Sequence, residues 1–172
     1  MTKHLDKGKA GCVFCRKLED GSEIIYSNGI FAAQFDRFPV APGHAELFPV
    51  SHTESIGDMD ELQRSCLFVT LGDLVEIINS TDLEELYHNM AENPLDGISK
   101  AMCEYMLSKP YLKEPFVDYN LGCNNGRLAG RTVDHLHFHI IPRHSGDVAD
   151  PVGGVRHTIP GMGNYRNWKM TE

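Results

Sequence analysis

The chain has 172 residues, 41% hydrophobic and 23% charged, which fits one globular domain of ordinary size and excludes a disordered polymer. Its formal net charge of −8 argues against general binding to nucleic-acid backbone, although a few local donors can still form a small anion site. No apolar run reaches the roughly 18–20 residues of a membrane span, and the polar N-terminus lacks a secretory signal. We therefore expect a cytoplasmic protein without a membrane partner.

The first half of the chain predicts a short helix and three strands. Residues 1–11 are polar and are expected to form a flexible tail, and residues 13–20 allow a helical turn. A turn signal, Ser27-Asn28-Gly29, joins the first two strands. The three strands are expected over residues 24–26, 30–35 and 44–50.

The second half predicts helices followed by two more strands. Apolar residues recur every three or four positions between residues 55 and 79, which indicates one long helix. Thr81 and Glu84 have capping-box spacing, so a further helical segment is expected to about residue 91. After a break at Asn93-Pro94, another is expected over about 95–108, and both belong to a helical insertion of about 80–112. Strands over 116–123 and 132–141 and an irregular tail over 146–172 complete the prediction. The order predicts an α+β fold with a five-stranded antiparallel meander sheet.

Three histidines alternate with apolar residues in the last predicted strand, at His135, His137 and His139. Side chains of a strand alternate between its two faces, so the three imidazoles are expected to share one face. Clustered imidazoles suit either metal ligation or nucleophilic and acid–base chemistry. The preceding loop, residues 124–132, offers amides, a hydroxyl, guanidiniums and glycine N–H groups, which favour a phosphate cradle beside a histidine nucleophile.

The stretch AGRTVDHLHFHIIPR resembles the motif of the histidine triad (HIT) superfamily, in particular of its dinucleoside polyphosphate hydrolases. The opening CVFC and the residues FD, PGH and PVSH further along the chain are also similar to bacterial members. The resemblance covers residues of about 12–52 and 116–145, and it implies a HIT domain over residues 12–145. It does not extend to residues 80–112, which are longer than the usual connection.

The resemblance assigns roles to residues around the triad. It implies that His137 attacks the α-phosphate and carries the nucleotide covalently, while His139 donates to a phosphate oxygen or to the leaving group. It further implies that Asn124 and Thr132 contact phosphate and that Asp36 accepts hydrogen bonds from ribose hydroxyls. Arg131 replaces the usual glutamine, and we weigh equally a polyphosphate contact and a solvent-facing side chain.

A structural zinc ion is the cofactor that the resemblance implies. Its ligands would be Cys12 and Cys15, in Cys-x-x-Cys spacing, with His52 and His135. Two thiolates and two imidazoles suit a closed tetrahedral zinc site, whereas Cys-x-x-Cys alone is a weak signal that free thiols also satisfy. The other three cysteines, Cys66, Cys103 and Cys123, are expected to be buried free thiols.

The sequence thus predicts a hydrolase of dinucleoside polyphosphates, with adenosine as the expected base. A nucleoside phosphoramidase, a nucleotidyl transferase or phosphorylase, a nucleotide-binding module without turnover and a three-histidine catalytic metal centre remain alternatives. The resemblance also implies a homodimer. The apolar helix stripe Leu67, Leu71, Leu74, Val75 and Ile78 is either its contact or part of the core.

Overall fold

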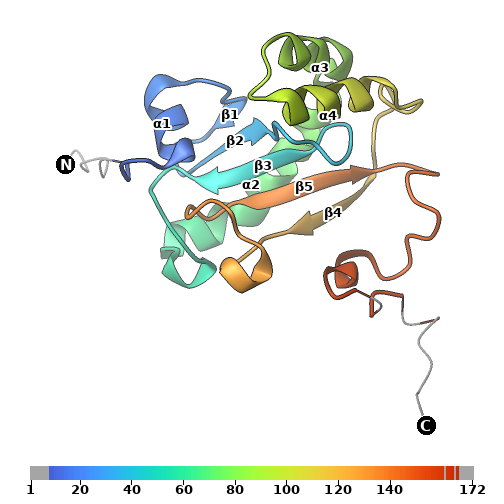
Figure 1. The fold of residues 1–172 in the computed structure, drawn as a ribbon. Coiled ribbons are helices and arrows are strands. Elements are labelled where there is room, and N and C mark those ends of the chain that lie inside the picture. Colours follow the sequence, from blue (N-terminus) through green and yellow to red (C-terminus); the bar gives the residue numbers. More distant parts are fainter. Residues whose placement is uncertain (1–7, 161, 165, 167–172) are drawn as a thin grey trace.

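The computed structural model describes residues 8–160, 162–164 and 166, and it forms an α+β fold around one antiparallel sheet (Figure 1). The expected flexible tail over residues 1–11 lies largely outside the described residues, as does the end of the predicted C-terminal tail. None of the helices in the described ranges combines the length and apolar character needed to cross a membrane.

The sheet has five strands, as predicted, in the order β1-β2-β3-β5-β4. This order corrects the expected meander. After β3 the chain passes through the helices and returns as the edge strand β4, and β5 then fills the place between β3 and β4. The histidine strand is therefore central. The strands are β1 Tyr26–Ser27, β2 Phe31–Phe35, β3 Ala45–Pro49, β4 Asp118–Gly122 and β5 Phe138–Arg143.

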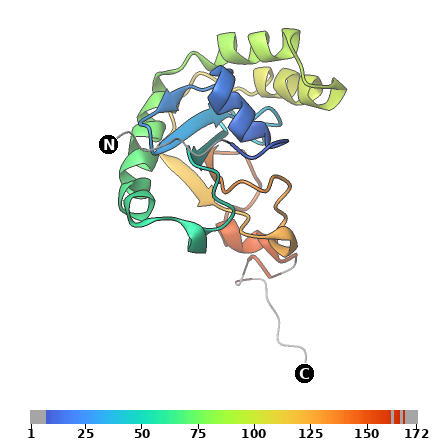
Figure 2. The ribbon, with the colours of Figure 1, turned by 90° about the vertical axis from the view of Figure 1, so that its left-hand side faces the viewer.

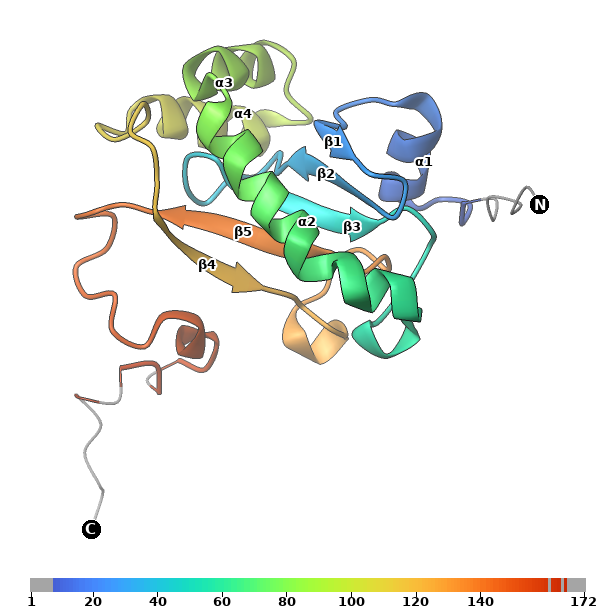
Figure 3. The ribbon, with the colours of Figure 1, turned by 180° about the vertical axis from the view of Figure 1, so that it is seen from behind.

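The long helix α2, Glu61–Ser80, crosses one face of the sheet (Figure 3). Its start lies six residues after the predicted one, because Asp60 and Gln63 form a capping box there. Leu71, Leu74 and Ile78 are buried in the core with alternate residues of β2, β3 and β5. Most of the apolar stripe is therefore core within this chain, and the exposed apolar residues Leu62, Phe68 and Val69 lie elsewhere on α2.

Helices α3, Leu83–Glu92, and α4, Gly97–Leu107, lie together beside the sheet (Figure 2). Both fall within the predicted helical insertion. Thr81 is not the cap of α3, since its hydroxyl donates to the Ile77 carbonyl of the preceding helix. Asp82 caps the helix instead and accepts from two backbone N–H groups.

Helix α1, Val13–Asp20, occupies the predicted residues and packs on the face of the sheet opposite α2. Phe14 stacks on Phe48 with ring centroids 4.3 Å apart, and Ala32 completes this second apolar cluster. Among the described residues there are also three short 3-10 helices: η1 Ile56–Asp58, η2 Arg127–Ala129 and η3 Gly154–Thr158. Of the three cysteines outside the Cys-x-x-Cys pair, Cys103 is buried while Cys66 and Cys123 are only half-buried.

Candidate functional site

The last strand begins at Phe138, so the prediction of a strand from residue 132 is wrong at its start. The ladder between β3 and β5 ends at Leu47 and Phe138, next to Pro49. Pro49 has no N–H to donate, and its carbonyl oxygen lies 2.9 Å from Nε2 of His135. His135 and His137 therefore sit on irregular backbone, and only His139 belongs to the strand.

His137 is held in one tautomer by the backbone carbonyl two residues before it. Its Nδ1 lies 2.8 Å from the His135 carbonyl oxygen, which can only accept, so Nδ1 carries the proton. Nε2 then keeps its lone pair. The side chain is buried, and its ring meets Phe14 at 5.3 Å and His139 at 5.0 Å between centroids. This arrangement presents one bare imidazole nitrogen as a nucleophile.

His139 is hydrogen-bonded to His44, the histidine of the PGH residues. Nδ1 of His139 lies 3.0 Å from Nε2 of His44. Two groups compete for Nδ1 of His44: the Val40 N–H at 3.4 Å and the Asp36 carboxylate at 3.3 Å. Asp36 thus lies next to the histidines, and in this structure it pairs with His44.

Burial keeps His139 and His44 neutral. It lowers the pKa of His139 to about 4, an effect to which His44 and His137 add and which Asp36 opposes. Burial likewise lowers the pKa of His44, against the attraction of Asp36. At neutral pH, His139 therefore offers hydrogen bonds rather than a positive charge.

A row of buried polar side chains beside the histidines was not predicted from the sequence. In the sheet register Gln34 pairs with Glu46, and Glu46 pairs with His139. All three alternate with core residues, so they share the face opposite α2. A carboxylate inside the apolar run of residues 44–50 was the signal that could have revealed this row.

The loop between β4 and β5 carries the three other predicted residues. Asn124 is half-buried beside Gly130, and Thr132 is exposed at a cavity of about 320 Å³ that Cys12 and His52 also line. Arg131 is not simply solvent-facing: it donates to the Glu54 carbonyl and pairs with Asp134 at 3.0 Å. These contacts tie the loop to the segment after β3.

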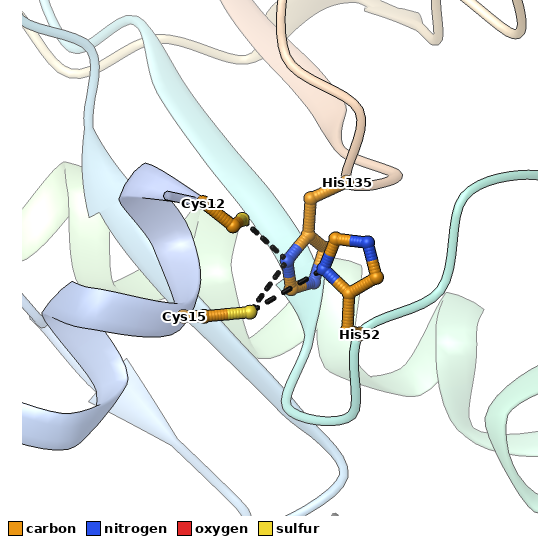
Figure 4. Close-up of side chains that lie close together, drawn as sticks. All are labelled: Cys12, Cys15, His52 and His135. Carbon is orange, nitrogen blue, oxygen red and sulfur yellow. Dashed lines mark hydrogen bonds between the residues drawn. The ribbon is translucent and has the colours of Figure 1, made fainter. Parts of the chain in front are cut away.

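The predicted metal ligands Cys12, Cys15, His52 and His135 converge, with all four ligand atoms within 4.8 Å of one another (Figure 4). Nδ1 of His135 lies 3.4 Å from Sγ of Cys12 and 3.7 Å from Sγ of Cys15, and Nδ1 of His52 lies 3.3 Å from Sγ of Cys15. They come from α1 and its N-cap, the segment after β3 and the segment before β5.

The donor set fits a tetrahedral ion. Zinc bonds of about 2.3 Å to sulfur and 2.0–2.1 Å to nitrogen place neighbouring ligands roughly 3.3–3.8 Å apart, as the measured separations are. Nε2–H of His135 donates a hydrogen bond to the Pro49 carbonyl, so the lone pair lies on Nδ1, which faces the thiols. The four residues can therefore bind one metal ion.

Comparison with protein-family models matches the HIT domain to residues 17–146, most of the chain. The protein belongs to the HIT family. An uncharacterized HIT-like protein of Methanocaldococcus jannaschii is 30% identical over 140 residues, covering 79% of this chain and 81% of the relative. This match supports the family and leaves the activity open.

Two HIT relatives from Schizosaccharomyces pombe carry enzyme names. An adenosine 5'-monophosphoramidase is 24% identical over 150 residues, 86% of either chain. A bis(5'-nucleosyl)-tetraphosphatase (asymmetrical) is 23% identical over 138 residues, 80% of this chain and 58% of the relative. The names of these two relatives show that HIT proteins include a phosphoramidase and a tetraphosphatase.

Solved HIT structures share the fold. A HIT family protein from Bacillus anthracis has a TM-score of 0.56 at 22% identity and covers 80% of this chain and 77% of its own. A zinc-bound histidine triad family protein from Mycobacterium smegmatis has a TM-score of 0.50 at 22% identity, with coverage of 81% and 80%. At this identity the likeness establishes the α+β HIT fold alone.

Proposed function

We propose that this protein hydrolyses nucleotidyl compounds through a covalent nucleotidyl-His137 intermediate. The observation that carries the proposal is the hydrogen bond from Nδ1–H of His137 to the His135 carbonyl, which leaves Nε2 as the nucleophile. Its lone pair forms a bond to the α-phosphorus while the bond to the leaving group breaks. Water then cleaves the phosphorus–nitrogen bond and returns the electron pair to Nε2.

The remaining predicted residues complete the site. His139 donates to a phosphate oxygen, and Asn124 and Thr132 contact the phosphates from the loop before β5. Asp36 accepts hydrogen bonds from the ribose hydroxyls when a bound nucleotide replaces its pairing with His44. Arg131 reaches a polyphosphate only if it leaves Asp134.

The substrate we propose is a dinucleoside polyphosphate, with adenosine as the expected base. The tetraphosphatase relative supports this choice. The phosphoramidase relative supports the second candidate, a nucleoside phosphoramidate, which the same nucleophile can cleave with an amine as leaving group. Transferase or phosphorylase activity, and nucleotide binding without turnover, are the outcomes that the experiment below also separates.

We also propose that Cys12, Cys15, His52 and His135 hold a structural zinc ion. Four protein ligands leave no open position for substrate, so the metal would stabilise the fold and take no part in the reaction. The convergence of the four residues and the zinc-bound HIT structure support this proposal. The zinc would fix His135, whose carbonyl orients the nucleophile.

A cytoplasmic homodimer is the assembly we propose. Phe68 and Val69 on α2 are 75% and 69% exposed, and Leu62 is 54% exposed. Large apolar side chains that gather on one helix are candidates for contact with a second copy. Sedimentation of the purified chain measures the oligomeric state.

The decisive experiment is mass spectrometry of the protein mixed with diadenosine tetraphosphate and quenched in alkali, where a phosphoramidate survives. We expect an adduct of one nucleoside monophosphate on His137, together with release of two nucleotides. An adduct that passes to phosphate or to another nucleotide instead of water identifies a phosphorylase or transferase. Binding without adduct or products identifies a binding module and contradicts the proposal.

A further inference from the structure

A chain of buried polar side chains runs from α1 to the histidine pair. Nζ of Lys17 donates to Oε1 of Gln34 at 2.7 Å, and Nε2 of Gln34 donates to Oε2 of Glu46 at 2.7 Å. The three residues are only 6%, 3% and 8% exposed. Burying a carboxyl among polar partners is costly and calls for a physical reason.

Glu46 ends this chain next to the nucleophile. A carboxylate oxygen of Glu46 and ring nitrogens of His137 and His139 lie within 4.8 Å of one another. Lys17 is held by Glu23 at 2.6 Å, so Gln34 stands between the ammonium and Glu46. The Glu46 carboxyl is thus oriented by an uncharged amide.

Cleavage of a nucleoside phosphoramidate, the second candidate substrate, requires a proton donor that the histidines do not provide. Its amine leaving group must take up a proton as the bond to phosphorus breaks, whereas a polyphosphate departs as an anion. His137 acts as the nucleophile, and buried His139 is neutral, with Nδ1 engaged by His44. Glu46 is the carboxyl beside both rings.

We propose that Glu46 is the acid–base residue of this site, an inference that rests on the proposed function. In the first half-reaction the His137 nitrogen–phosphorus bond forms, the bond to the leaving group breaks, and the Glu46 carboxyl gives its proton to the leaving atom. In the second half-reaction water adds to phosphorus, gives a proton to the Glu46 carboxylate, and the electron pair returns to His137. Each turnover restores the protonated carboxyl and consumes one water.

The electrostatic surroundings fit this role. Burial, with the nearby charge of Asp36, raises the pKa of Glu46 to about 7, while Gln34 and Lys17 oppose the rise. The other titratable groups on this face are His44, His137 and His139. A carboxyl with a pKa near 7 can both give and accept a proton at neutral pH.

The variant Glu46→Gln tests the proposal because it keeps the size and an oxygen that accepts from Gln34. Its kcat/KM is measured on two adenylates, a 4-nitrophenyl ester, whose leaving group departs as a stable anion, and an alkyl phosphoramidate, whose amine needs a proton. We expect a loss of about 100-fold or more on the phosphoramidate, the scale of general acid catalysis. On the ester the loss should be much smaller.

Lys17→Met is the matched control, since it disrupts the same polar chain and retains the carboxyl. Below pH 7, where the Glu46 carboxyl stays protonated with or without Lys17, this variant should affect both substrates equally. An equal loss on both substrates in Glu46→Gln, or no loss on either, overturns the acid–base role while the His137 adduct keeps the proposed function intact. Absence of that adduct and of turnover in the wild type overturns both.

A second measurement covers the case in which Glu46→Gln does not fold. In the wild type, kcat/KM for the phosphoramidate should fall as pH rises through about 7, because the acid form of Glu46 is lost. The 4-nitrophenyl ester should show no such fall. Parallel pH profiles for the two substrates would contradict the proposal.

Discussion

Removal of the zinc proposed for Cys12, Cys15, His52 and His135 should destabilise the fold before it stops catalysis. The change is Cys12→Ser, or chelation of the native protein. Cys12 and His135 are separated by 123 positions, so the metal closes a loop that contains most of the domain. Without the metal, the unfolded chain gains conformational entropy, which lowers the free energy of unfolding.

The size of the effect follows from the length of that loop. A covalent cross-link that closes about 100 residues is worth about 4–5 kcal/mol by loop entropy, and a tetrahedral metal that joins the same residues acts similarly. For a chain of this size, each kcal/mol shifts Tm by roughly 2–4 °C. We therefore expect Tm to fall by roughly 10–20 °C.

Thermal melting with and without chelator, together with elemental analysis, measures the effect. Cys66→Ser is the matched control, because Cys66 is a half-buried thiol outside the four-residue cluster. Turnover below the lowered Tm should persist, since no ligand position is open to substrate. Native protein with well under one zinc per chain, or equal Tm values for the two serine variants, would refute this reasoning.

The other predictions concern the nucleophile and its surroundings. His137→Asn should lower the rate by several powers of ten, about 5 kcal/mol or more, and activity above a tenth of the parent's would exclude covalent catalysis. Because the pKa of His139 falls from 6.5 to about 4 on folding, the parent should lose up to about 3 kcal/mol as pH drops through that window. Denaturant titrations of His139→Gln should show a smaller loss, and part of it should remain because the pKa of His44 is also lowered. Arg131→Gln should cost about 1–3 kcal/mol of stability through its lost contacts to Glu54 and Asp134, and a changed preference among substrates of different phosphate number would show that it also reaches substrate.

Most of the helices and strands could be predicted because they depend on residues close to one another in the sequence. The apolar stripe of α2 and the turn at Asn28, whose side chain accepts from the N–H groups of Ile30 and Phe31, depend on neighbouring residues. The helices within residues 80–112 were likewise visible from spacing. The cap of α3 was predicted at Thr81 but is Asp82, because these adjacent residues are both good capping residues.

The alternation of histidines and apolar residues predicted a strand from residue 132, but the backbone there depends on a distant residue. To extend β5 toward residue 132, the chain would have to pair with β3 beyond Leu47, and Pro49 has no N–H for that pairing. His135 consequently turns toward the thiols, while His137 and His139 stay together. One short histidine repeat thereby supplies both a member of the four-residue cluster and the proposed nucleophile.

The role proposed for Asp36 would couple nucleotide binding to the chemistry of this site. Its carboxylate and the Val40 N–H compete for Nδ1 of His44, at 3.3 and 3.4 Å. If ribose hydroxyls bind Asp36, Nδ1 of His44 is free to accept a hydrogen bond from the Val40 N–H. The His44 proton then lies on Nε2. That nitrogen then donates to Nδ1 of His139, whose own proton must sit on Nε2. A ribose bound at Asp36 would thus set His139 as the donor that a phosphate oxygen requires.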